Sequence, residues 1–327
     1  MSTIKDINGQ SIKDFLLKRG TGIGMVVILL ILGMRANMFF AVGNLMDVLK
    51  QGSVLTLIAL GISAVLVSGG FDMGAGALVQ LTCNLTAGLI IGGLNPMLTI
   101  PVGMGVGLII GLLNSFLVVV MRIPTFVATL GSMFVLQGLT TLYNDGHALT
   151  IVAQPGFSFL GQGSIGPVPV IFLIVILVCA LMHYFLKHTK TGLRMYAAGE
   201  NPAAAALRGV SIRKYMVIGY CLSGVVLGLT GVLQCSYTYG ASAISSGMDF
   251  LIQALSAAYL GTTFSKTGEL SVVGTVFSGM FIAALSNALI INGISNQQIA
   301  GILGLILILS ILITVINKRE IGQVTIF

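Results

Sequence analysis

The chain has 327 residues, of which only 16 are Lys or Arg and 9 are Asp or Glu. A soluble domain of this length would carry roughly 80 charged residues, about a quarter of its sequence. Hydrophobic residues make up 56% of the chain and its mean hydropathy is +1.04, which is more apolar surface than a water-soluble protein can bury. These values exclude a soluble enzyme, a disordered tail and a nucleic-acid-binding module. They predict an all-α, polytopic membrane protein with no nucleic-acid partner.

Ten apolar runs follow one another along the chain. A helix needs about 20 apolar residues to cross the hydrocarbon layer of a membrane, so each run is a candidate span. The runs cover residues 20–40, 51–71, 74–92, 96–120, 124–143, 168–186, 215–235, 250–264, 271–291 and 297–317. We therefore predict about ten transmembrane helices in one domain over residues 20–317. The first run is the least regular because it contains Arg35, and the eighth is short.

The positions of the basic residues predict how the chain is oriented. If the N-terminus is cytoplasmic, 14 of the 16 Lys and Arg residues lie in inner segments and only Arg35 and Lys50 lie outside. An excess of Lys and Arg marks cytoplasmic loops, so both termini are predicted to be cytoplasmic. The cytoplasmic segments are then 1–19 at the N-terminus, the main loop 187–214 and the C-terminal tail 318–327. The longer outer connections are 144–167 and 236–249.

Signatures of catalysis are missing from the sequence. There is no G-x-x-x-x-G-K-[ST] phosphate loop, and no H-E-x-x-H, C-x-x-C or G-x-S-x-G pattern. None of the three His residues has another metal-ligating residue at ligand spacing. We therefore expect no catalytic residue, no metal site and no bound cofactor, and we do not expect this chain to hydrolyse ATP by itself.

One carboxyl group stands between two apolar runs. Asp72 lies in S-G-G-F-D-M-G-A-G-A (68–77), where the second run ends and the third begins, near the predicted cytoplasmic face. An ionisable residue inside a membrane domain is a functional candidate, here in a broken or re-entrant segment beside a transport path. The structural alternative is that Asp72 caps the next helix while Gly69 and Gly70 turn the chain. A series of carboxylates across the membrane, which a proton-driven pump would need, is missing.

The fifth run carries regularly spaced hydroxyl groups. It begins with R-I-P-T-F-V-A-T-L-G-S-M (122–133), and Pro124 suits the first turn of a helix. Thr125, Thr129 and Ser132 recur on one helical face. They fit either hydrogen bonding between helices or a polar stripe along a sugar path, and the pattern alone leaves both open.

Glycines at four-residue spacing predict close helix packing. They are Gly103, Gly107 and Gly111 in one run, and Gly224 and Gly228 in another. Small residues at this spacing let membrane helices approach closely. We interpret them as packing residues rather than as part of a functional site.

The loop 187–214 contains a short predicted helix. Asn201 can cap its first turn, Pro202 suits the first helical position, and the four alanines that follow favour a helix. Gly209 then ends it. Because an apolar helix of this length is unstable alone in water, it must dock either on its own membrane domain or on a cytoplasmic partner.

Three motifs resemble one family of transport proteins. The segment T-G-L-R-M-Y-A-A-G-E-N-P-A-A-A-A-L-R-G-V (191–210) resembles the cytoplasmic coupling segment of ribose-type ABC importer permeases, which also serve xylose, galactose and autoinducer-2. The pattern there is approximately T-x-x-G-R-x-x-Y-A-x-G-x-N-x-x-A-A-x-x-x-G-I. Residues 68–77 are similar to the family's S-G-G-I-D-L-S-V-G-S, and residues 124–133 to P-x-F-I-x-T-L-G-T-M. The three motifs occur in the family's order and cover nearly the whole chain.

The resemblance implies a function and a set of partners. The chain would be the permease subunit of an ABC importer in the cell inner membrane, which passes a sugar or sugar-like molecule into the cytoplasm by alternating access. A separate ATPase subunit would bind the ATP. The other partners would be a second permease copy or paralogue, an extracytoplasmic substrate-binding protein and membrane lipid.

The resemblance also implies two groups of functional residues. Those expected to couple to the ATPase are Gly199, Glu200, Asn201, Pro202, Ala204, Ala205, Arg208, Gly209 and Val210. Those expected along the translocation path are Phe71, Asp72, Phe126, Thr129 and Ser132.

The sequence departs from the family pattern in two places. Gly74 and Ala77 stand where the family motif has serines after its Asp, which is Asp72 here. The family also has a Gly-rich run after the eighth span, and in this chain that run reads L-G-T-T-F-S-K-T-G-E-L-S-V-V-G-T (260–275). If that run forms the inner gate or meets the ATPase, gating or partner choice differs here. Two other interpretations stay open: an ATP-independent secondary transporter or channel, and a permease of the related amino-acid or nucleoside branch.

Overall fold

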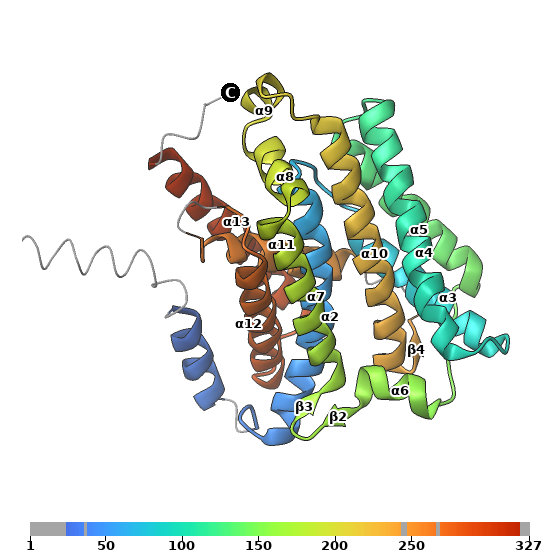
Figure 1. Ribbon diagram of the computed structural model, residues 1–327. Coiled ribbons are helices and arrows are strands. Elements are labelled where there is room, and N and C mark those ends of the chain that lie inside the picture. Colours follow the sequence, from blue (N-terminus) through green and yellow to red (C-terminus); the bar gives the residue numbers. More distant parts are fainter. Residues whose placement is uncertain (1–23, 36–37, 243–246, 266–268, 321–327) are drawn as a thin grey trace, which may run out of the picture.

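The computed structural model describes residues 24–35, 38–242, 247–265 and 269–320, and most of these residues are helical (Figure 1). Each of the ten predicted apolar runs contains a helix. In chain order these helices are Gly24–Arg35, α2 (Val42–Val67), α3 (Ala75–Ile91), α4 (Thr99–Ser115), α5 (Thr125–Asn144), α7 (Val170–His188), α10 (Ile212–Thr238), α11 (Gly247–Thr262), α12 (Val272–Ile291) and α13 (Asn296–Glu320). The predicted all-α, polytopic class is confirmed.

The helices differ in how readily they could cross a membrane. Within the described ranges, six stretches are long and apolar enough: α2, Pro96–Val120, α5, α7, α10 and α12. The helix Gly24–Arg35, α3 and the first part of α13 are apolar but shorter, and α11 has 16 residues. The number of ten spans therefore stays a prediction.

Short elements connect the long helices. They are the 3-10 helix η1 (Pro96–Leu98), the π-helix η2 (Phe116–Val120), the helices α6 (Pro155–Gln162), α8 (Lys190–Glu200) and α9 (Pro202–Leu207), and the strands β1 (Leu149–Thr150), β2 (Ser164–Ile165), β3 (Val168–Pro169) and β4 (Gly240–Ala241). β1 pairs with β4, and β2 with β3, both antiparallel.

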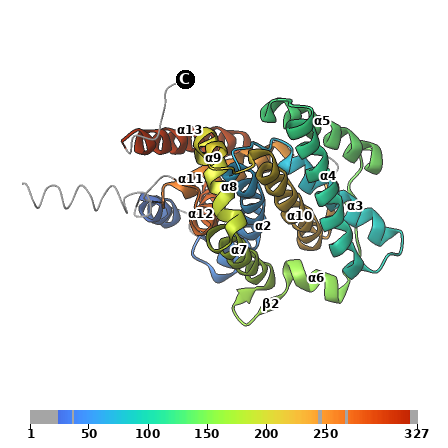
Figure 2. The same cartoon turned by 45° about the horizontal axis from the view of Figure 1, so that its top comes forward.

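Two helices form the centre of the bundle. α2 is buried along most of its length, and both views show it surrounded by other helices (Figure 2). α10 packs against α4 through the predicted glycines. A Cβ atom at Gly107 would overlap the carbonyl oxygen of Gly224, and one at Gly228 would overlap that of Gly103. The interpretation of these glycines as packing residues is confirmed, because no larger side chain fits the α4–α10 crossing.

The two ends of the bundle are built differently. At one end, α6 packs on the end of α10, where the Gly161 N–H donates to Ser236 Oγ at 2.9 Å and Gln162 Nε2 donates to the Tyr237 carbonyl oxygen at 2.6 Å. The two short strand pairs lie at this same end, and α8 and α9 lie at the other (Figure 1). The predicted outer connection 144–167 and the described residues of the connection 236–249 thus share one end, opposite the loop 187–214. Which end faces the cytoplasm stays a prediction.

Several predicted boundaries need correction. The loop 187–214 is mostly helical, since α7 continues to His188, α8 and α9 follow, and α10 begins at Ile212. Pro124 is the N-cap residue of α5 rather than a residue of its first turn. α13 continues to Glu320, past the predicted limit of 317. The predicted N-terminal segment 1–19 and residues 321–327 of the tail lie outside the described residues.

Candidate coupling and translocation site

The short helix predicted in the basic loop is present as α9. The Asn201 side chain accepts a hydrogen bond from the Ala204 N–H at 3.0 Å, Pro202 is the first helical residue, and Gly209 leaves the helix at a φ of 76°. Five of its six residues are exposed, and Leu207 retains 91% of its surface. α9 therefore presents an apolar side chain to the outside of the chain, and the membrane domain itself does not cover it.

A second helix, α8, precedes α9, and it was not predicted. The Thr189 hydroxyl caps it by accepting from the Gly192 N–H at 3.1 Å. Glycine inside a helix is costly, but a Cβ atom at Gly192 would overlap the backbone of Phe185 and Leu186 in α7. The buried face of α8, which includes Met195 and Ala198, therefore fixes the position of α9 relative to the bundle.

The end of α8 touches the turn that follows α2. A Cβ atom at Gly199 would overlap the carbonyl oxygen of Val67, and one at Gly69 would lie 3.1 Å from the Gly199 Cα atom. Gly69 also has a φ of 80°, which a residue with a side chain adopts only at a cost. Gly199, one of the predicted coupling residues, thus touches the turn that leads into the segment predicted to line the path.

α8 also holds the connection between α11 and α12. Tyr196 donates a hydrogen bond from its hydroxyl to the Leu270 carbonyl oxygen at 2.7 Å. Lys187 pairs with Glu269 at 3.1 Å, and its ammonium lies 4.1 Å from the centre of the Tyr196 ring. Burial raises the pKa of Tyr196, and the nearby carboxylates of Glu269 and Glu200 raise it further. The phenol therefore stays protonated and can donate this hydrogen bond at physiological pH.

The chain between α2 and α3 forms a non-helical turn around Asp72. This side chain is only 4% exposed, and its Oδ1 atom accepts a hydrogen bond from the Gly74 N–H at 2.9 Å. The N-cap residue of α3 is Gly74, so Asp72 does not occupy the N-cap position itself. The carboxylate instead stabilises the turn two residues before the helix, because a side-chain oxygen of Asp can accept from the backbone two residues on.

α5 and α10 hold this turn from two sides. The Thr129 hydroxyl accepts from the Met73 N–H at 3.1 Å and donates to the Thr125 carbonyl oxygen at 2.8 Å. Tyr220 of α10 donates to the Phe71 carbonyl oxygen at 2.9 Å. The rings of Phe71 and Phe126 lie with their centres 6.2 Å apart. Four of the five predicted path residues therefore lie together in this turn and the start of α5.

Ser132 lies one turn further along α5 and is partly buried. Among the described residues, no hydrogen bond to the turn around Asp72 is formed by Ser132. Thr129 has no exposed surface, and its hydroxyl bonds only to backbone groups of the turn and of α5 among the described residues. The role of these residues along a translocation path stays a prediction.

The remaining predicted coupling residues lie in α9 or directly beside it in the chain. Ala205 is buried, whereas Ala204, Arg208 and Gly209 are exposed. Val210 is partly buried and its N–H donates to the Ala205 carbonyl oxygen at 3.0 Å.

In the divergent run 260–275, Gly261 and Gly274 meet at the α11–α12 crossing, where a Cβ atom on either would overlap the other helix. Gly261 and Gly274 therefore allow α11 and α12 to pack closely.

Comparison with known proteins agrees with the three motifs. Residues 44–315 match the family described as branched-chain amino acid transport system permease component. The chain is 32% identical to the ribose import permease protein RbsC of Bacillus subtilis (strain 168), over 90% of this chain and 92% of that protein.

Two Escherichia coli (strain K12) proteins are also similar. The ribose import permease protein RbsC is 28% identical over 94% of this chain and 96% of that protein. The D-allose transport system permease protein AlsC is 28% identical over 90% of each. No solved structure matches the chain. The match to the family and the similarity to these relatives span nearly its whole length, so the chain belongs to the family of ribose-type ABC importer permeases.

Proposed function

We propose that the chain is the membrane-spanning subunit of an ABC sugar importer, in which a separate ATPase subunit docks on α9 and drives alternating access. The observation that carries this proposal is the exposure of α9. α9 has six residues, and its Leu207 side chain is 91% exposed. A helix this short is unstable in water unless other contacts stabilise it. A docked partner that buries Leu207 would supply such contacts.

The contacts of α8 offer a route from the docked ATPase to the bundle. α9 follows α8 with only Asn201 between them. α8 touches the turn after α2 through Gly199 and holds the α11–α12 connection through Tyr196. A shift of α9 would therefore displace two connections at once. Tightly packed elements of this kind move between discrete arrangements rather than deforming continuously.

The sugar class comes from the relatives, because the similar proteins are named as ribose and D-allose permeases. The family description mentions branched-chain amino acids, which favours the amino-acid branch as the second candidate. The full importer would contain two permease subunits, and a binding protein would deliver substrate at the end formed by α6 and the strand pairs. The transporter would lie in the cell inner membrane.

One reconstitution separates these possibilities. The permease is incorporated into liposomes with its ATPase and binding protein, and uptake and ATP hydrolysis are measured across sugars, nucleosides and amino acids. We expect ATP-dependent sugar uptake. A variant in which residues 199–210 are replaced by a Gly/Ser linker should lose both ATPase binding and uptake. Normal uptake by the chain alone, driven by a proton or sodium gradient without ATP, would refute the proposal.

A further inference from the structure

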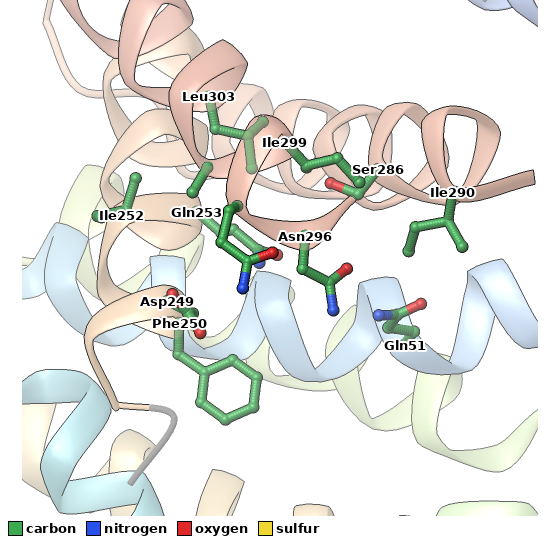
Figure 3. A pocket seen from close by; sticks show the side chains of 12 residues that line it. Gln51, Asp249, Phe250, Ile252, Gln253, Ser286, Ile290, Asn296, Ile299 and Leu303 are labelled. Carbon is green, nitrogen blue, oxygen red and sulfur yellow. The ribbon is translucent and has the colours of Figure 1, made fainter. Parts of the chain in front are cut away.

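A cavity with both polar and apolar walls lies between four helices, away from the residues discussed so far. Its volume is about 580 Å³, within the usual range for small-molecule sites. The polar residues that line it are Gln51 of α2, Asp249 and Gln253 of α11, Ser286 of α12, and Asn296 and Gln297 of α13. Figure 3 shows side chains from these helices around one shared space. The helices bring together residues up to 252 positions apart (51 and 303).

Ser286 is a buried polar group without a hydrogen-bond partner among the described residues. Its side chain is 6% exposed and lines the cavity, and its Oγ atom has no hydrogen-bond partner among the residues that the structure describes. A buried hydroxyl without a hydrogen bond destabilises a protein, and buried polar groups normally have partners. A ligand hydroxyl in the cavity would supply the missing partner.

Six of the twelve lining residues are apolar, and the polar groups of the other six suit one chemical class of ligand. Amide groups of Gln51, Gln253 and Asn296 both donate and accept hydrogen bonds, and the Asp249 carboxylate accepts them. Phe250 adds an aromatic wall, and no Lys, Arg or His is among the described lining residues. Groups that donate and accept suit the hydroxyls of a sugar, whereas the carboxylate and the missing cations disfavour a phosphorylated one.

The cavity lies at the end of the bundle opposite α9. Gln51 is in the first half of α2 and Asp249 is in the first turn of α11, while the last residue of α2, Val67, touches α8. The predicted orientation places this end outside the cytoplasm. We propose that the cavity is a binding site of the permease itself for a neutral, polyhydroxylated molecule. This inference rests on the proposed import function and adds a saturable site on the substrate's entry side.

A fluorescent reporter can be placed in the cavity because the chain contains no Trp. Phe250→Trp introduces a single indole at the cavity wall. The purified permease is titrated in lipid nanodiscs with D-ribose and D-allose, and with ribose 5-phosphate as the anionic control. We expect a saturable change in fluorescence with at least one neutral sugar and none with the phosphate. Equilibrium dialysis of radiolabelled D-ribose and D-allose against the unmodified chain repeats the measurement without the substitution.

Two serines of α12 provide a matched pair of variants. Ser278 and Ser286 are both buried with hydroxyls that lack a partner among the described residues, but only Ser286 lines the cavity. Ser286→Ala should weaken sugar binding by about 3- to 10-fold without lowering the unfolding temperature. Ser278→Ala should leave binding unchanged. Neither variant removes a described hydrogen bond, so loss of folding is not expected.

The outcomes separate this inference from the proposed function. No saturable binding of D-ribose or D-allose by either method, equal effects of the two serine variants, or equal binding of ribose 5-phosphate would overturn the inference. A fluorescence change that follows permease concentration or added binding protein instead of sugar would also overturn it, because the cavity would then be a protein interface. ATP-dependent sugar uptake by the reconstituted importer would still support the proposed function in each of these cases.

Discussion

Leu207 should contribute strongly to ATPase binding and little to the stability of the permease. It is 91% exposed at the end of α9, so the folded chain gains almost nothing from it. If the ATPase buries this side chain, Leu207→Ala removes three carbon groups from the interface. At about 0.8 kcal/mol for each buried CH₂ group, the loss is about 2 kcal/mol. This corresponds to a roughly 30-fold increase in the Kd of the ATPase subunit.

The assay measures the Kd between permease in nanodiscs and the purified ATPase, together with the thermal unfolding of each permease variant. Leu142→Ala is the matched control, since Leu142 is 75% exposed near the end of α5, away from α9. Both substitutions are on the surface and should change stability by less than about 0.5 kcal/mol. An unchanged Kd for Leu207→Ala, or an equal rise for Leu142→Ala, would refute docking on α9.

Three further substitutions test the route from α9 to the bundle. Gly199→Ala forces a Cβ atom against the Val67 carbonyl oxygen, so uptake should fall at least about tenfold while ATPase binding persists; retained uptake in liposomes would contradict the route. Tyr196→Phe removes the hydrogen bond to Leu270 and should cost about 1 kcal/mol of stability, measured by unfolding against Tyr184→Phe, whose residue is 64% exposed. Asp72→Asn keeps an oxygen that can accept from Gly74 and should lower uptake without changing the unfolding temperature; uptake at the original level would mean that Asp72 serves only the turn.

Local signals in the sequence predicted the positions of the helices well. Long apolar runs located each main helix because burial in a membrane or a core requires them. Asn201, Pro202 and Gly209 located α9, because capping, first-turn and terminating residues act on neighbours within a few positions. The spacing of Gly103, Gly107 and Gly111 likewise predicted a close helix crossing.

Contacts between distant residues could not be predicted in this way. α8 was not predicted because Gly192 has a low helix propensity. The reason for a glycine at this position is its contact with the backbone of α7, which only the structure shows. Tyr196 and Leu270 are 74 residues apart, and nothing near either residue indicates the pairing. The contact between Gly69 and Gly199 is likewise not indicated by their sequence neighbours. That the Ser286 hydroxyl lacks a hydrogen-bond partner among the described residues is known only from the packing of α12. The exposure of the Leu207 side chain was not predicted, because exposure depends on how the whole chain folds.

In the proposed importer, α9 lies on the cytoplasmic side and the ATPase subunit covers it, and this placement can be measured directly. It is tested by labelling a single cysteine at position 207 (Leu207→Cys), after replacement of Cys83, Cys179, Cys221 and Cys235, with a membrane-impermeant maleimide in right-side-out and inverted vesicles. We predict labelling only in inverted vesicles, and protection when the ATPase subunit is bound. Labelling in right-side-out vesicles, or equal labelling with and without bound ATPase, would contradict the account.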